Sequence, residues 1–135
     1  MIGFEPPARE TVGRAKGGEG NLGAGGRLSF GSIYPAQKFD KKAYVKAHLA
    51  RTDRLEVGLL CLEPGQVQAQ HVHDEADTLH YIVDGVATIT VGKESQELGP
   101  GAFAIAKAGE PHSVANQGRD RLTYVVVSSP PHAKK

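Results

Sequence analysis

The stretch that decides the fold is Gly65-Gln66-Val67-Gln68-Ala69-Gln70-His71-Val72-His73. Its side chains alternate in character with a period of two, as in a β-strand that turns one face toward a core. The alternation predicts an outward face of glutamines and an inward face made of Val67, Ala69, His71 and His73. Two inward histidines at positions i and i+2 bring their imidazoles within reach of one metal ion. Two packed core histidines would give the same pattern, so this stretch alone leaves the choice open.

Short apolar segments separated by turn residues surround this stretch. They recur at the spacing of a strand plus a turn, which is typical of an all-β barrel or sandwich. Residues 41–50 have a helix-forming composition, but their alternation leads us to interpret them as a strand. Asp84-Gly85 lies between two apolar runs and predicts a hairpin. We expect strands over residues 28–34, 41–50, 55–62, 66–73, 79–83, 86–91, 102–106, 113–116 and 122–127.

Two sets of residues resemble the two motifs of the cupin family. The first motif, G-x5-H-x-H-x3-4-E-x6-G, is matched by Gly65, His71, His73 and Gly85. The second, G-x5-P-x-G-x2-H-x3-N, is matched by Gly101, Gly109, His112 and Asn116. The sequence is similar to small single-domain cupins with the type-2 conserved barrel. The resemblance implies an all-β fold, the double-stranded β-helix or jelly-roll barrel, which we place at residues 28–129.

The composition changes outside this barrel. Half of the fourteen residues 13–26 are glycine, and such a stretch has little apolar surface to bury. We therefore expect residues 1–27 to form a flexible Gly-rich arm and residues 130–135 to form a C-terminal tail. The arm lacks the G-x-x-x-x-G-K-[ST] pattern of a phosphate-binding loop, which argues against nucleotide binding there.

The resemblance to cupins implies that His71, His73 and His112 hold one divalent transition metal. We favour iron, with zinc, nickel, manganese and copper as alternatives. The sequence departs from the family pattern at two positions, because Thr78 stands in place of a glutamate and Lys107 in place of a proline. Three neutral imidazoles add no negative charge to the ion, which would stay a strong Lewis acid with open positions. Such an ion binds anionic or bidentate ligands well.

Two residues near Thr78 are candidates to compensate for the missing glutamate. Asp77 is adjacent, but alternation turns it outward if Thr78 faces inward. His80 keeps the inward parity of Thr78 and lies about 6.6 Å further along the strand. That distance fits a catalytic role in proton transfer, or a supporting contact, better than metal ligation. The alternative interpretations are a solvated aspartate and a packed pocket histidine.

The other candidate residues carry weaker signals. His48 and His132 are predicted to be solvated, His132 because it lies in the Pro-rich tail. Asn116 is expected to secure a turn, and Cys61, in an apolar run, is expected to be a buried and inert thiol. Tyr81 should face away from the metal by alternation. A small, partly apolar cavity is expected, with a lining drawn from Val67, Ala69, Ile82 and Phe103 or Ile105.

Charge and composition exclude several classes of partner. The chain has 135 residues, with 16 Lys and Arg against 15 Asp and Glu, so it presents no basic field for nucleic acid or for an anionic membrane. The N-terminus has no apolar segment typical of a signal peptide. The single cysteine fits a reducing compartment, and we expect a cytoplasmic protein. Members of the cupin family that this sequence resembles usually dimerise, so the resemblance also implies a homodimer.

These observations leave three functional hypotheses. The first is a mononuclear metalloenzyme with a three-histidine site for a small bidentate or anionic substrate, with dioxygenase chemistry favoured and isomerase or lyase chemistry close behind. The second is a non-enzymatic module that binds a small ligand, since the fold serves both uses. The third is a structural protein that associates through residues 28–34 added as a strand to a partner sheet.

Overall fold

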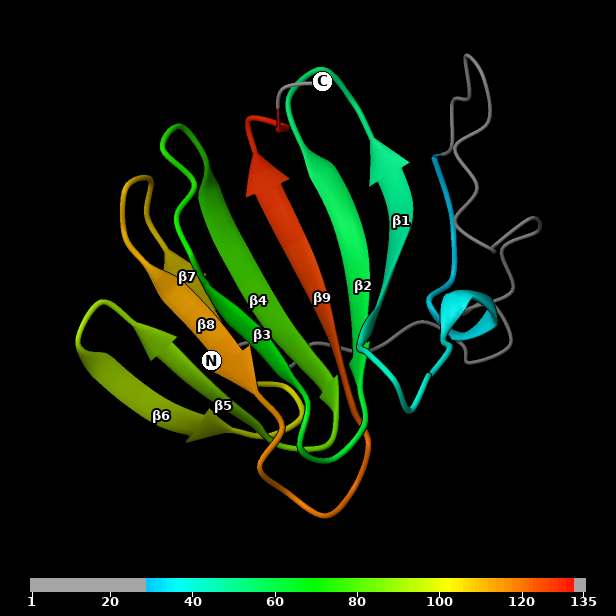
Figure 1. Cartoon of the computed structure of the whole chain (residues 1–135). Coiled ribbons are helices and arrows are strands. Elements are labelled where there is room, and N and C mark those ends of the chain that lie inside the picture. The colour runs from blue at the N-terminus through cyan, green and yellow to red at the C-terminus, as the bar shows by residue number, and fades with distance from the viewer. Residues whose placement is uncertain (1–28, 133–135) are drawn as a thin grey trace, which may run out of the picture.

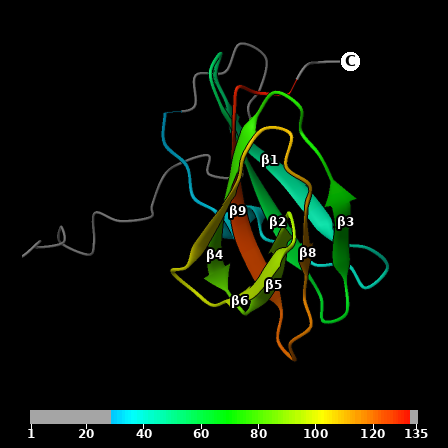
Figure 2. The same ribbon diagram turned by 90° about the vertical axis from the view of Figure 1, so that its left-hand side faces the viewer.

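Two antiparallel sheets form the barrel in residues 29–132, the part of the chain that this computed structural model describes (Figure 1). The larger sheet has the order β1 (Val45–Arg51), β2 (Glu56–Leu62), β9 (Leu122–Ser129), β4 (Asp77–Asp84) and β7 (Phe103–Ala106). The smaller sheet has the order β3 (Val67–His71), β8 (His112–Ala115), β5 (Ala87–Val91) and β6 (Glu94–Leu98). Figure 2 shows the two sheets as separate layers. This is the predicted double-stranded β-helix.

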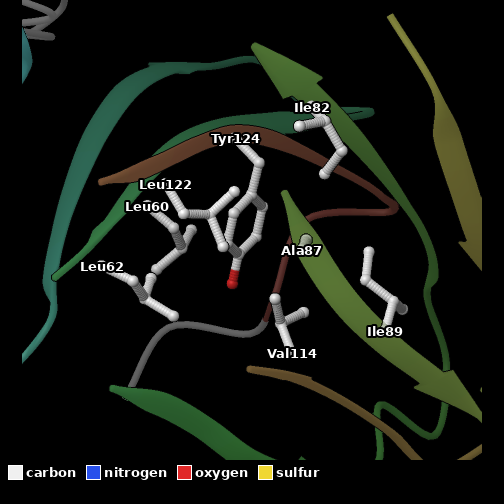
Figure 3. Close-up of a cluster of buried hydrophobic side chains, with 8 residues drawn as sticks. All are labelled: Leu60, Leu62, Ile82, Ala87, Ile89, Val114, Leu122 and Tyr124. Atoms are coloured by element: carbon white, nitrogen blue, oxygen red, sulfur yellow. The ribbon is translucent and has the colours of Figure 1, made fainter. Parts of the chain in front are cut away.

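A core of eight buried side chains fills the space between the sheets (Figure 3). The larger sheet contributes most of it and the smaller sheet supplies Ala87, Ile89 and Val114. Tyr124 is fully buried, and its hydroxyl donates a hydrogen bond of 2.7 Å to Gln68 Oε1, which removes the cost of an unpaired polar tip. The full set is Leu60, Leu62, Ile82, Ala87, Ile89, Val114, Leu122 and Tyr124.

Strand β2 is buried on both of its faces. Leu60 and Leu62 face the core between the sheets, whereas Leu59 and Cys61 pack in a second cluster with Ala36 and Leu49. Burial on both faces explains why this strand has a continuous apolar run instead of an alternating one.

The hairpin predicted at Asp84-Gly85 is wrong. Strand β4 pairs with β7 and β9, whereas β5 pairs with β6 and β8, so the segment between them crosses from one sheet to the other. Gly85 has φ +84°, and a Cβ added there would lie 2.3 Å from the carbonyl oxygen of Arg121. Turn residues between two apolar runs therefore marked a tight crossing here and not a pairing of the two runs.

The strand predicted over residues 28–34 is also wrong. Residues 29–32 are irregular, and Tyr34–Ala36 form a single 3₁₀ turn with Pro35 at its start. The turn satisfies its own backbone, because Ala36 N donates to Ile33 O and Gln37 N donates to Tyr34 O. No strand is therefore offered to a partner sheet at 29–34. The predicted strand at 41–50 is confirmed in its second half, as β1.

The predicted arm at residues 1–27 lies outside the described residues. Within residues 29–132, no helix has the length and apolar character needed to cross a membrane.

Candidate metal centre

His71, His73 and His112 come together at the end of the strand pair β3 and β8. His71 ends β3 and is paired directly with His112, the first residue of β8, while His73 lies just beyond β3. The ring centroid of His71 lies 4.2 Å from that of His112 and 4.8 Å from that of His73, and the His73 and His112 centroids are 5.3 Å apart. One ring nitrogen from each residue lies within 4.8 Å of the other two. This group could hold a metal ion.

A β-bulge in β3 changes which side chains accompany these histidines. Gln68 is paired with Val114 and His71 with His112, so three steps along β3 match two steps along β8. The shift breaks the simple alternation: Gln68 turns inward to Tyr124, and Val67 is 51 % exposed. The predicted inward position of Val67 and outward position of Gln68 are therefore wrong. The residue inserted between Gln68 and His71 reverses the alternation a second time, so His71 faces inward as predicted.

Backbone carbonyls fix the orientation of two of the three imidazoles. His71 Nδ1 lies 2.9 Å from Ala69 O, and His112 Nδ1 lies 3.0 Å from Glu110 O. A carbonyl only accepts, so Nδ1 carries the proton in each neutral ring and Nε2 keeps its lone pair. His112 Nε2 is buried without a hydrogen-bond partner. Free, oriented nitrogen donors of this kind are what a transition metal requires.

The local environment lowers the pKa of two of the three histidines. Burial, together with the neighbouring His132, His71 and His112, lowers the pKa of His73 to about 4. Burial is also the main cause that lowers the pKa of His112. Neutral imidazole is the form that binds metal, so at pH 7 His73 and His112 have no proton to lose before ligation.

Thr78 occupies the buried place that a glutamate has in the family pattern. It is 1 % exposed, and its hydroxyl lies 3.4 Å from that of Ser128. Asp77 is exposed, and its carboxylate accepts a hydrogen bond from Ala108 N at 2.8 Å, so it does not face the histidines. Strand β4 therefore brings no carboxylate to the three histidines.

A cavity of about 430 Å³ opens beside His71 and His73. Its wall includes Tyr44, Lys46 and Gln68, together with Thr78 and Ser128. The predicted lining is largely wrong. Ala69 does line the cavity, but Ile82 belongs to the core, and Val67, Phe103 and Ile105 are exposed. The cavity is therefore more polar than expected.

His80 lies in the wall of this cavity, on the inward face predicted for it. It is 1 % exposed, its ring centroid is 5.4 Å from that of His112, and its Nδ1 has no hydrogen-bond partner. Burial lowers the pKa of His80 to about 4. His80 lies outside the group of three that could share a metal ion. Its catalytic role stays a prediction.

His132 is the residue at this site that the sequence did not indicate. The prediction of a solvated side chain is wrong, because His132 lines the cavity and its ring centroid is 4.2 Å from that of His73. The contact that brings it here is with Glu56, 76 positions earlier in the chain. No local pattern in the tail could have revealed that contact. His48 is exposed, as predicted, at the mouth of the same cavity.

Three of the other predictions are confirmed. Asn116 is buried and secures a turn, since its side chain donates to Leu62 O and Asp120 O and accepts from Gly118 N. Cys61 is 1 % exposed, and burial raises the pKa of its thiol. Tyr81 is 44 % exposed and faces away from the three histidines. These residues support the barrel and take no part in the cavity.

The fold and the site together define a double-stranded β-helix barrel with a three-histidine cluster in its wall. Residues 58–128 match the family described as "Cupin domain", and the chain belongs to this family. The uncharacterized protein SCO3923 of Streptomyces coelicolor is 34 % identical over 83 residues, which cover 62 % of this chain and 77 % of that protein.

Two solved structures have closely similar folds. TT1209 of Thermus thermophilus is 30 % identical, with a TM-score of 0.74, over 78 % of this chain and all of that one. An uncharacterized conserved protein with a double-stranded beta-helix domain from Klebsiella pneumoniae is 25 % identical, with a TM-score of 0.74, over 80 % of this chain and 95 % of that one. Both likenesses extend over most of the described barrel.

Proposed function

We propose that this protein is a mononuclear metal enzyme in which His71, His73 and His112 hold one divalent transition metal. The observation that carries the proposal is the convergence of three imidazoles, two with a carbonyl-fixed Nδ1, beside a polar cavity. Iron is the ion we favour over zinc, nickel, manganese and copper. The substrate would be small and either bidentate or anionic, because the three ligands bring no negative charge.

The chemistry we favour is oxygenation, with isomerisation or elimination close behind. A bound ion would supply Lewis acidity, redox capacity in the case of iron, and open positions for a chelating substrate and for dioxygen. The chain's own residues would orient the substrate and exclude water. His80 is our candidate for proton transfer, because its Nδ1 has no partner and the ring lies in the cavity wall.

The alternative is a non-enzymatic module that binds a small ligand in the same cavity. The observation that favours it is the burial of His80, which at 1 % exposed has little room to exchange a proton with a substrate. Both proposals require the metal, so metal binding does not distinguish them. Catalytic turnover of a substrate does.

Metal analysis of protein purified without chelator tests the proposal. We expect about one transition-metal ion per chain by elemental analysis, and loss of that ion in His71→Ala. His48→Ala is the matched control, since His48 is an exposed histidine at the cavity mouth, and it should keep the ion. Oxygen uptake with panels of small acids and diketones then separates oxygenation from isomerisation. A wild-type protein without stoichiometric metal would contradict the proposal.

We further propose a cytoplasmic homodimer. The buried, single Cys61 supports a reducing compartment.

The dimer is supported by an exposed apolar surface. Tyr81 and Phe103 are paired across β4 and β7, and with Ile105 they expose apolar surface beside the edge strand β7. Light scattering after size exclusion should give the mass of a dimer for the wild type and of a monomer for Phe103→Glu.

A further inference from the structure

His132, in the Pro-rich tail that follows β9, is held at the cavity by two residues of the larger sheet. Arg51 and Glu56 are paired across β1 and β2, and Arg51 Nη1 donates to Glu56 Oε1 at 2.9 Å. The same oxygen accepts a hydrogen bond of 2.6 Å from His132 N, and Arg51 Nη2 donates to His132 O at 2.7 Å. Both backbone groups of His132 are therefore anchored. Glu56 is only 9 % exposed, which strengthens these charge-assisted contacts.

The same anchor orients the imidazole of His132. Nδ1 lies 3.5 Å from Glu56 Oε2, and Nε2 is buried without a hydrogen-bond partner. The ring is inclined at 31° to that of His73, with 4.2 Å between centroids. His132 lines the cavity, so its Nε2 is a polar atom of fixed position that still needs a hydrogen-bond partner there.

The charges around the cavity favour an anion. Glu56 is the carboxylate that lines it, and Arg51 already pairs with Glu56. Lys46 lines the cavity as well, and among residues 29–132 no carboxylate forms an ion pair with it. A carboxylate ligand would neutralise both this lysine and a metal ion.

We propose that His132 is a ligand-positioning residue and that the cavity takes a small hydroxycarboxylate. The carboxylate would bind at the three histidines and Lys46, while Nε2 of His132 forms a hydrogen bond with the ligand hydroxyl, a group that can donate or accept. This proposal rests on the proposed function, because the ligand needs a metal at His71, His73 and His112. His132 itself is not assigned as a metal ligand, since it lies outside the group whose nitrogens converge.

Acetate and glycolate test the proposal, because they differ only by one hydroxyl. The protein is loaded with Co²⁺, and the binding of each anion is followed by the change in the visible spectrum of the ion. We expect His132→Ala to bind Co²⁺ as the wild type does and to lose about five- to tenfold in glycolate affinity, the worth of one hydrogen bond. Acetate affinity should change less than about twofold. Glu56→Gln, which weakens the anchor, should shift glycolate in the same direction.

The outcomes separate this proposal from the proposed function. Equal losses for both anions, or no loss for glycolate, would overturn the role of His132 while leaving the metal centre intact. A fall of Co²⁺ affinity by more than about tenfold in His132→Ala would make His132 a metal-supporting residue and overturn the positioning role. A wild-type protein that binds no Co²⁺ would overturn both. His48→Ala serves as the matched histidine control for Co²⁺ binding, and thermal melting confirms that each variant is folded.

Discussion

The hydroxyl of Thr78 lies 3.4 Å from the hydroxyl of Ser128, in the wall of the cavity that His71 and His73 also line. The two residues are paired across β4 and β9. The place where the family pattern has a carboxylate therefore holds a small pair of hydroxyl groups. This pair brings no negative charge to the proposed metal site, and it leaves room for a ligand to supply that charge.

Restoring the carboxylate should strengthen metal binding and weaken the metal-free protein. In Thr78→Glu we expect tighter binding of Co²⁺ or Zn²⁺, because the added charge is that of the usual ligand set. Without metal, the buried carboxylate should lower the free energy of unfolding by about 1–3 kcal/mol. Metal titration by calorimetry and urea unfolding with and without chelator measure the two effects.

Thr78→Gln is the control, since it has the size of glutamate without the charge. It should lower stability without raising metal affinity. If Thr78→Glu and Thr78→Gln bind metal equally, the position does not face the ion, and the missing glutamate has no bearing on the charge of the site.

The motif residues could be predicted from the sequence because each motif has a fixed spacing between its glycines and its histidines. His71, His73 and His112 converge as the resemblance implied, and the inward place of His80 followed from the parity of Thr78 on one regular strand. Alternation failed at Val67, because the bulge between Gln68 and His71 inserts a residue between Val67 and the histidines. A period of two carries no sign of such an insertion, so Val67 and Gln68 were each assigned to the wrong face.

The contacts that sequence reasoning missed are those between distant segments. Gly85 allows a crossing between sheets, but the same Asp-Gly pair is also a strong hairpin signal. His132 reaches the cavity only through Glu56 and Arg51, which are far from it in the chain. Long-range pairing of this kind depends on strand order, which local patterns do not specify.

Any side chain added at Gly85, in the segment that crosses between the sheets, should strongly lower the free energy of unfolding. Gly85→Ala combines strain at φ +84° with a Cβ 2.3 Å from Arg121 O, and we expect a loss of at least about 3 kcal/mol in the free energy of unfolding. Gly101→Ala is the matched control: it has φ +89° but no atom within 4 Å of the added Cβ, so it should lose only about 1–2 kcal/mol. Urea unfolding of both variants measures the difference. Equal losses would show that the close approach to Arg121 costs nothing.

Removing the side chain of Asn116, which follows β8, should also lower the stability of the barrel. Asn116→Ala leaves the carbonyls of Leu62 and Asp120 and the amide of Gly118 without their side-chain partner. Because Asn116 is 1 % exposed, we expect a loss of about 2–4 kcal/mol in urea unfolding. The adjacent Gln117 is exposed and bonds only to Thr88 at 3.3 Å, so Gln117→Ala should change stability by less than about 0.5 kcal/mol. A small effect for Asn116→Ala would refute its role in securing this turn.

The buried His80 predicts how the stability of the metal-free protein depends on pH. Burial lowers the pKa of His80 from 6.5 to about 4, so between these values the unfolded chain binds a proton that the folded protein excludes. The unfolded state then binds more protons, and stability falls as the pH falls from about 6.5 toward 4. The full contribution of His80 is at most about 3 kcal/mol, reached at the acid end of this window.

Urea unfolding of chelator-treated protein at pH 7 and at pH 5 measures the effect. We expect the loss of stability between the two pH values to be smaller in His80→Gln than in the wild type, because glutamine does not titrate. His73 keeps its own lowered pKa in both proteins, so some loss remains in the variant. His48→Gln is the control, since an exposed histidine should leave the wild-type loss unchanged. An equal loss in His80→Gln and in the wild type would mean that folded His80 takes up its proton as readily as the unfolded chain does, so that its burial has no effect on the charge of the cavity wall.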